Sequence, residues 1–387
     1  MAFKRYIRRT LVAATAFAAS IAGPSIASRA SEPLNVITST AIIADAAKQV
    51  GGKLAKVTPL MGANIDPHSY RPTRSDIAAL SKANLILWNG LELEERLEEI
   101  MENISKRRTV VAVAEALPED KLLKNAEEAH EDEHKDEHGH KEKKHSHKKE
   151  KHAHKKEKHA HKHGHDHGHK KEKKEKHAHK EEHGHKDEHA HAHGEYDPHV
   201  WMNPRVWSHV VEVIRDAMIK AKPEHEEAFT KNAEAYIKEL AKLDSYAKKV
   251  LGSVTAKSRV LVTAHDAFGY FGSAYDYKVE GIQGLSTLNE VGLKRIADMA
   301  KMLTDNKISA IFVETTVAGN NVKAVIEGAK ALGHKVALGR EIFSGSMGKP
   351  GTYEGTYIGM IDHNVTTISR ALGGTAPEKG MNGKLSG

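Results

Sequence analysis

Three histidines lie in loops beside predicted strands or helices, in sequence contexts that suit a metal ligand. His68 lies in the string NIDPHSY and His199 in YDPHVW, so a proline stiffens the chain before each of them. His265 directly follows a predicted strand, in the string TAHD. Neutral imidazole is the commonest metal ligand among side chains, and three of them suit Zn²⁺. A single loop histidine is usually a solvated surface residue, but the matching contexts predict a metal site formed by His68, His199 and His265.

Each of these histidines has a carboxylate close by in the sequence. Asp66, Asp197 and Asp266 would suit hydrogen-bond acceptors that fix the tautomer of the neighbouring ring, although ordinary loop carboxylates are an equally good interpretation. The other histidines outside the His-rich segment described next lie at polar positions on or beside predicted helices, where a surface role is expected: His209, His225, His334 and His363.

A long His-rich segment interrupts the chain. Of the 28 histidines, 21 lie between residues 130 and 193, mostly as His-x-His pairs, and residues 127–195 contain no Leu, Ile, Val, Phe, Met or Trp. Such a segment cannot bury a core and is expected to be disordered without metal. We expect it to bind additional zinc ions weakly. It would gather zinc for the main site or sense the zinc level, and the alternative is a solvating spacer.

The N-terminus has the pattern of a cleavable secretory signal over residues 1–30. Four basic residues precede a stretch of small apolar residues, 10–23, that is too short to span a bilayer comfortably. The chain has no cysteine, which excludes a lipid-modified cysteine, a disulfide scaffold and a thiolate zinc site. Five of the basic residues behind the net charge of +7 lie in these first 30 residues, so the charge does not indicate nucleic-acid binding. The expected location is the periplasm.

The mature chain alternates between short apolar runs and amphipathic runs. Alternation of this kind predicts an α/β fold with parallel sheets covered on both faces. The predicted strands are residues 34–38, 56–60, 85–88, 110–113, 259–263, 308–313 and 335–338. The predicted helices are residues 40–51, 75–83, 92–106, 203–220, 224–251, 288–304 and 320–332.

The long helix divides the pattern into two α/β blocks, which predicts two lobes joined by a rigid helical strut. The expected organisation is a signal peptide at 1–30, an N-terminal metal-binding lobe at 31–222 with the disordered loop 127–195, a connecting helix at 223–252, a C-terminal lobe at 253–372 and a flexible tail at 373–387. A helical connection resists bending more than a loop hinge does, so only limited closure is expected.

Several strings together resemble the zinc/manganese solute-binding proteins of ABC importers. They are DPHSY, DPHVWMNP, VTAHDAFGYF, FVE ending at Glu314, and GTYEGTYIGMIDHNV with FSGSMG before it, and the resemblance covers about residues 34–372. It implies two α/β lobes and one metal in the cleft between them, with His68 and His199 from the first lobe and His265 from the second. It also implies a monomeric binding protein that delivers zinc to an inner-membrane permease, and no enzymatic activity.

One departure from the family pattern concerns the ligands. The family often has an aspartate where this chain has Gly345, and its manganese and iron branches tend to have a carboxylate where His265 stands. The site would then have three imidazoles and one open position for water, a nearby carboxylate or a histidine of the insertion. A site rich in imidazole favours Zn²⁺ over Mn²⁺, although Cu²⁺ would bind more tightly than either.

Two other functions remain compatible with three histidines. A secreted zinc hydrolase would use the same three ligands with an open fourth position. No general base is evident beside the three histidines in the sequence, which argues against that hydrolase. An adhesin-type metal-binding protein is the third interpretation, and the absence of an anchor or a repeat module argues against it.

Overall fold

The computed structural model describes residues 32–125 and 194–386. The predicted signal peptide and all but the last two residues of the predicted disordered loop lie outside these ranges. Within them, no helix combines the length and the apolar character that a membrane crossing requires.

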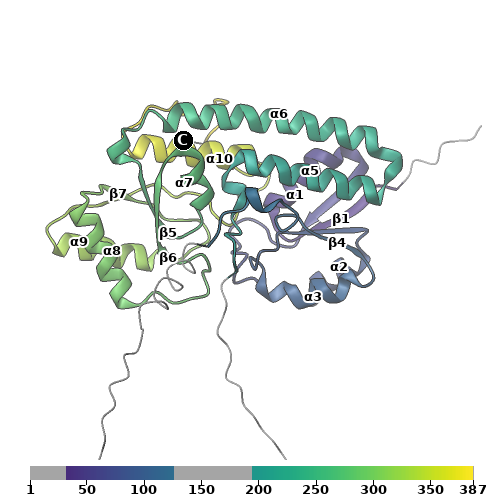
Figure 1. Cartoon of the computed structure of the whole chain (residues 1–387), viewed down its shortest axis with the longest axis horizontal. Helices are drawn as coiled ribbons and strands as arrows, with labels where there is room; N and C mark the ends of the chain where they lie inside the picture. The colour runs from purple at the N-terminus through teal and green to yellow at the C-terminus, as the bar shows by residue number, and fades with distance from the viewer. Residues whose placement is uncertain (1–31, 126–193, 387) are drawn as a thin grey trace, which may run out of the picture.

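The first half of the chain forms a parallel sheet with the strand order β2-β1-β3-β4 (Figure 1). Every pair in this sheet is parallel, so the carboxyl ends of the strands meet at one edge. The interior strands are almost entirely buried because helices cover both faces. The four strands are β1 (Leu34–Thr38), β2 (Ala55–Pro59), β3 (Leu85–Trp88) and β4 (Thr109–Ala112).

The second half contains two further parallel pairs, β5–β6 and β7–β8. The backbone N–H of Phe312 donates to the carbonyl of Val262 at 2.9 Å, which joins the two pairs side by side. The strands are β5 (Val260–His265), β6 (Lys278–Gln283), β7 (Ala310–Ile311) and β8 (Ala337–Leu338).

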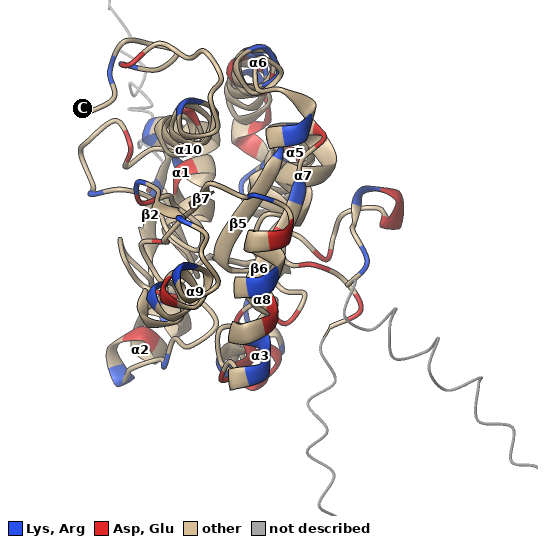
Figure 2. Ribbon diagram, turned by 90° about the vertical axis from the view of Figure 1, so that its left-hand side faces the viewer, with Lys and Arg blue, Asp and Glu red and all other residues tan. Residues whose placement is uncertain are grey.

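Nine α-helices surround these strands in the described part of the chain. Helix α6 runs across both halves at the top of Figure 1 and contacts α1, α5 and α10. In Figure 2, acidic and basic residues alternate along α8, where Lys294 pairs with Asp298 and Lys301 with Asp305, as on an ordinary solvated helix face. The helices are α1 (Ala41–Gly51), α2 (Arg74–Lys82), α3 (Glu95–Ser105), α5 (Pro204–Ala221), α6 (Glu226–Leu251), α7 (Gly269–Tyr275), α8 (Leu293–Asp305), α9 (Asn320–Ala331) and α10 (Tyr357–Ala371).

One apolar core extends from the first sheet into the second half of the molecule. It contains Leu34 of β1, Trp207 of α5, Leu243 of α6, Phe271 of α7 and Ile361 of α10, all at most 2% exposed. The N-terminal half of the structure, residues 32–125 and 194–222, and the C-terminal half, residues 253–386, are therefore packed together through apolar side chains.

The α/β class with parallel sheets is confirmed. The strands predicted at 308–313 and 335–338 are shorter, reduced to β7 and β8. The first residues of the helix predicted at 224–251 form a separate 3₁₀ turn, Pro223–His225. Helices α7 and α10 and strand β6 were not predicted.

The end of the chain is packed against α10, contrary to the expected flexible tail, as far as residue 386. The buried carboxylate of Asp362 on α10 accepts the backbone N–H of Met381 at 2.9 Å. Leu385 is only 5% exposed, and the N–H of Thr375 donates to the hydroxyl of Ser253 at 2.7 Å. A buried carboxylate needs hydrogen-bond donors, and the C-terminal segment provides one of them besides the hydroxyls of Thr366 and Tyr353.

Candidate metal centre

The fold brings His68, His199 and His265 together from three distant parts of the chain. Their exposed fractions are 4%, 0% and 1%. One ring nitrogen of each lies within 4.8 Å of the other two, and the Nε2 atoms of His68 and His199 are 3.2 Å apart. In the described residues, no other set of three or more His, Asp or Glu side chains has this arrangement. Ligands at about 2.0–2.1 Å from a tetrahedral zinc ion lie roughly 3.3 Å from one another, so small adjustments would complete the site.

His199 is held by the aspartate that precedes it by two residues. The Asp197 carboxylate accepts the backbone N–H of His199 at 2.9 Å and lies 2.8 Å from its Nδ1. A proton on Nδ1 leaves the Nε2 lone pair free for a metal, so this contact selects the binding tautomer. The prediction that Asp197 could orient a histidine is supported by this geometry.

His265 is the last residue of β5, whereas the sequence predicted that it would lie in the loop after this strand. Its Nδ1 lies 2.5 Å from Oε2 of Glu314, whose Oε1 accepts the backbone N–H of His265 at 2.9 Å. Glu314 follows β7, the neighbour of β5, and is 2% exposed. In the sequence analysis Glu314 appears only as the last residue of the FVE string, without a role. Its contact with His265 arises because β7 lies beside β5, which no local sequence pattern reveals.

His68 lies in the loop between β2 and α2 and has a different environment. Asp66 accepts its backbone N–H at 3.1 Å and also accepts the hydroxyl of Thr287 at 2.6 Å, so this carboxylate shapes the loop. The third neighbouring aspartate, Asp266, favours the protonated form of His265 through its negative charge.

Burial and the carboxylates set the charge of each ring. Burial, followed by the neighbouring histidines, holds the pKa of His68 and of His199 well below the ordinary value. Burial is the largest single influence on His265 and opposes its charge, but the carboxylates of Glu314, Asp66 and Asp266 together outweigh burial and raise the pKa of His265. Burial raises the pKa of Asp197 to about 7. Two of the three imidazoles are thus neutral at neutral pH, the form that binds metals.

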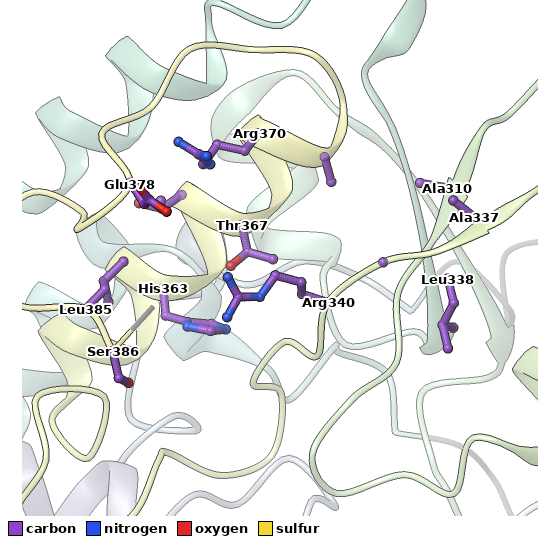
Figure 3. Close-up of a pocket in the computed structure, with 13 residues that line it drawn as sticks. Ala310, Ala337, Leu338, Arg340, His363, Thr367, Arg370, Glu378, Leu385 and Ser386 are labelled. Atoms are coloured by element: carbon purple, nitrogen blue, oxygen red, sulfur yellow. The ribbon is translucent and has the colours of Figure 1, made fainter.

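The other described histidines lie outside this cluster, as expected. His209 pairs with Glu212 on the surface of α5, and His334 contacts the carbonyl of Ile308. His363 contacts the carbonyl of Glu341 and borders a separate cavity of about 390 Å³ beside α10 (Figure 3). Arg340 and Arg370 also line that cavity, which includes none of the three clustered histidines.

Comparisons with known proteins agree with this geometry. Residues 36–371 match the family described as ZnuA, zinc-uptake complex component A periplasmic. The chain is 36% identical to the manganese-binding lipoprotein MntA of Bacillus subtilis over 370 residues, covering 95% of this chain and all of that protein. It is 34% identical to the zinc-binding protein TroA of Treponema pallidum over 337 residues, covering 87% and 88%.

The solved structure of the periplasmic zinc-binding protein TroA from Treponema pallidum has the same fold. It superposes with a TM-score of 0.69 at 33% identity and covers 88% of this chain and 99% of that one. The prediction of a non-enzymatic protein is confirmed, and the hydrolase interpretation is excluded with it. The chain belongs to the ZnuA family of extracytoplasmic solute-binding proteins, the metal-binding components of ABC importers.

Proposed function

We propose that the protein is a periplasmic zinc receptor that binds one Zn²⁺ at His68, His199 and His265 and passes it to an ABC permease in the inner membrane. The observation that carries the choice of zinc is the ligand set, which consists of three buried imidazoles and no carboxylate. Imidazole suits zinc, whereas manganese prefers carboxylate and water oxygens. Because its relatives include both manganese-binding and zinc-binding proteins, the proposal rests on this chain's own side chains.

The fourth coordination position is proposed to be open. A Cβ atom at Gly345 would lie only 2.7 Å from Cδ of Pro67, so the position where the family often has an aspartate is filled here by the loop that carries His68. The carboxylate of Glu314 pairs with Nδ1 of His265, on the side of the ring away from the proposed metal, so it would not supply the fourth ligand. A water molecule would complete a tetrahedral site.

We also propose how the parts of the chain act together when zinc is bound and then delivered to the permease. Residues 31–222 and 253–372 would act as two lobes, with residues 223–252 as the strut between them and the metal in the cleft. The loaded protein would dock on its permease as a monomer. The His-rich residues 130–193, which lie outside the described ranges, would bind further zinc ions weakly and supply the cleft at low zinc.

The test is a titration of the mature protein with Zn²⁺ and Mn²⁺ against a competing chelator, with and without residues 130–193. The expected result is one tight zinc site in both forms that His265→Ala abolishes, with manganese bound much more weakly. Tight binding that disappears with residues 130–193 would show that the three imidazoles are not sufficient. Preferential binding of manganese would refute the assignment of zinc.

A further inference from the structure

A buried metal site needs a path to solvent, and the structure shows one at His68. A small open cavity of about 30 Å³ lies at the seam between the two halves. His68 lines it, together with Glu92, Glu95 and Tyr196 from the first half and Ser286 from the second. A water molecule needs roughly 10–15 Å³ of such space, so the opening suits only one or two small ions or solvent molecules at a time.

The three imidazoles differ on their outer sides. The Nδ1 atoms of His199 and His265 face the carboxylates of Asp197 and Glu314. Among the described residues the hydrogen bonds of His68 use its backbone N–H and its Nε2, and none uses its Nδ1. Of the three rings, His68 is the one that lines the cavity, and no carboxylate in the described ranges pairs with its Nδ1.

The wall of the cavity contains two acidic residues, Glu92 and Glu95, and the turn before them has a well-defined backbone conformation. Gly90, Leu91 and Glu92 all have positive φ angles, 76°, 55° and 58°, a conformation that two non-glycine residues rarely adopt in succession. The buried carboxylate of Glu94 accepts the N–H groups of Asn89 and Gly90 at 3.0 and 3.2 Å and anchors this turn. The turn places Glu92, an exposed residue, at the rim.

Several acidic side chains near the cavity lie close enough together for their negative charges to interact. Burial, and then the charges of Glu92, Glu95 and Glu115, raise the pKa of Glu98 on α3. Carboxylates that disfavour one another's charge create a negative potential, which attracts cations and speeds their association.

We propose that the metal enters and leaves the triad through this cavity, that His68 is the first ligand it meets, and that Glu92 and Glu95 steer the cation to it. This inference rests on the proposed function. The carboxylates act at a distance and are not ligands of the bound ion. Their effect is therefore on the association rate and weakens as salt screens the field.

The test is stopped-flow zinc association with the full chain, followed by tryptophan fluorescence. The ring of Trp201 lies 5.3 Å from that of His199 and reports on the cleft, and the relevant phase is the one that His265→Ala removes. The double variant Glu92→Gln, Glu95→Gln is expected to slow association roughly three- to tenfold at low ionic strength, with the difference vanishing at about 1 M salt. The matched control is Glu226→Gln, Glu227→Gln, which removes the same charge from exposed positions at the start of α6.

A second variant tests the path sterically. Ser286→Phe places a ring in the cavity wall and is expected to slow association and dissociation by the same factor, leaving the equilibrium affinity within about twofold. Equal rates for the steering variant and its control, or unchanged rates in Ser286→Phe, would overturn the proposal. Failure of the proposed function is distinct, because the unmodified chain would then show no zinc phase that depends on His265.

Discussion

Carboxylates lie behind two of the three rings, His199 and His265, and would strengthen metal binding by those imidazoles. The contact with Asp197 holds a proton on Nδ1 of His199 and fixes its tautomer, and the Glu314 carboxylate places a negative charge beside Nδ1 of His265. In both rings the neighbouring charge makes Nε2 a better donor. The contact at His265 joins two fully buried groups, and burial in a low dielectric strengthens it.

Replacing Glu314 by Gln is expected to weaken zinc binding about 10- to 100-fold, because the ring of His265 loses the charge that orients and polarises it. The measurement is the zinc dissociation constant by chelator competition. Glu341→Gln, at an exposed position, is the control and should leave the affinity unchanged. An affinity within twofold of the original chain in Glu314→Gln would show that the carboxylate does not tune the site.

Among the three histidines, His265 should control the pH dependence of zinc binding. The pKa values of His68 and His199 lie well below the ordinary value, so these rings stay neutral as the pH falls, whereas the raised pKa of His265 makes it take up a proton first. Below the pKa of His265 the affinity should fall about tenfold per pH unit. Chelator competition between pH 5 and 8 measures this slope, and a fall near a thousandfold per unit would mean that all three rings protonate together.

At the residue scale the sequence was sufficient to select the three histidines that the fold brings together, but not all of the carboxylates that contact them. The strings around His68, His199 and His265 are local signals, and the contact of Asp197 with His199 spans two residues. Glu314 is 49 residues from His265 and reaches it because β7 lies beside β5. A contact of that kind depends on sheet topology, which local patterns do not contain.

At the scale of elements, one carboxylate joins three helices. Asp45 on α1 is 9% exposed and accepts the hydroxyl of Tyr236 on α6 and the first N–H of α10, at Tyr357, each at 3.2 Å. The N-terminal N–H groups of a helix have no partner within it, so Asp45 both satisfies α10 and fixes its position.

Asp45→Asn is expected to destabilise the zinc-free protein by about 1–3 kcal/mol, because the amide NH₂ replaces the second carboxylate oxygen and brings an unmatched donor into the core. One oxygen of Asp45 accepts both hydrogen bonds, and a neutral amide oxygen in its place is a weaker acceptor than a carboxylate. Urea unfolding measures the change. Tyr236→Phe removes only one of the bonds and should lose about 1 kcal/mol. Equal stability of Asp45→Asn and the original chain would mean that α10 is held by apolar packing alone.

The elements that prediction missed are those that depend most on their surroundings. Helix α10 contains Gly359 and several β-branched residues, which have low helix propensity, yet most of its side chains are buried. In β6, a Cβ atom at Gly281 would lie 2.6 Å from the backbone nitrogen of Asp266, so this glycine permits the close approach of two backbones. Tertiary packing outweighs local preference in both segments.

At the scale of the molecule, several contacts tie the two halves together around the triad. The Trp201 indole N–H donates to the carbonyl of Ser344 at 2.9 Å, and the Trp201 carbonyl accepts the hydroxyl of Tyr357 at 2.8 Å. Thr287 donates to Asp66 in the loop of His68. Together with the continuous core and α6, these contacts leave little freedom for a hinge.

Zinc binding should therefore change the spacing of the halves by about 2 Å or less, in the range of small shear motions. Because the chain has no cysteine, Lys82→Cys on α2 and Lys330→Cys on α9, exposed positions toward opposite ends of Figure 1, can be spin-labelled uniquely. Pulsed electron resonance then gives the distance between the labels with and without zinc. His265→Ala in the labelled chain is the control for zinc bound outside the cleft. A shift of roughly 5 Å or more that this control lacks would show a true hinge and would mean that the contacts at Trp201 and Thr287 break when the metal leaves.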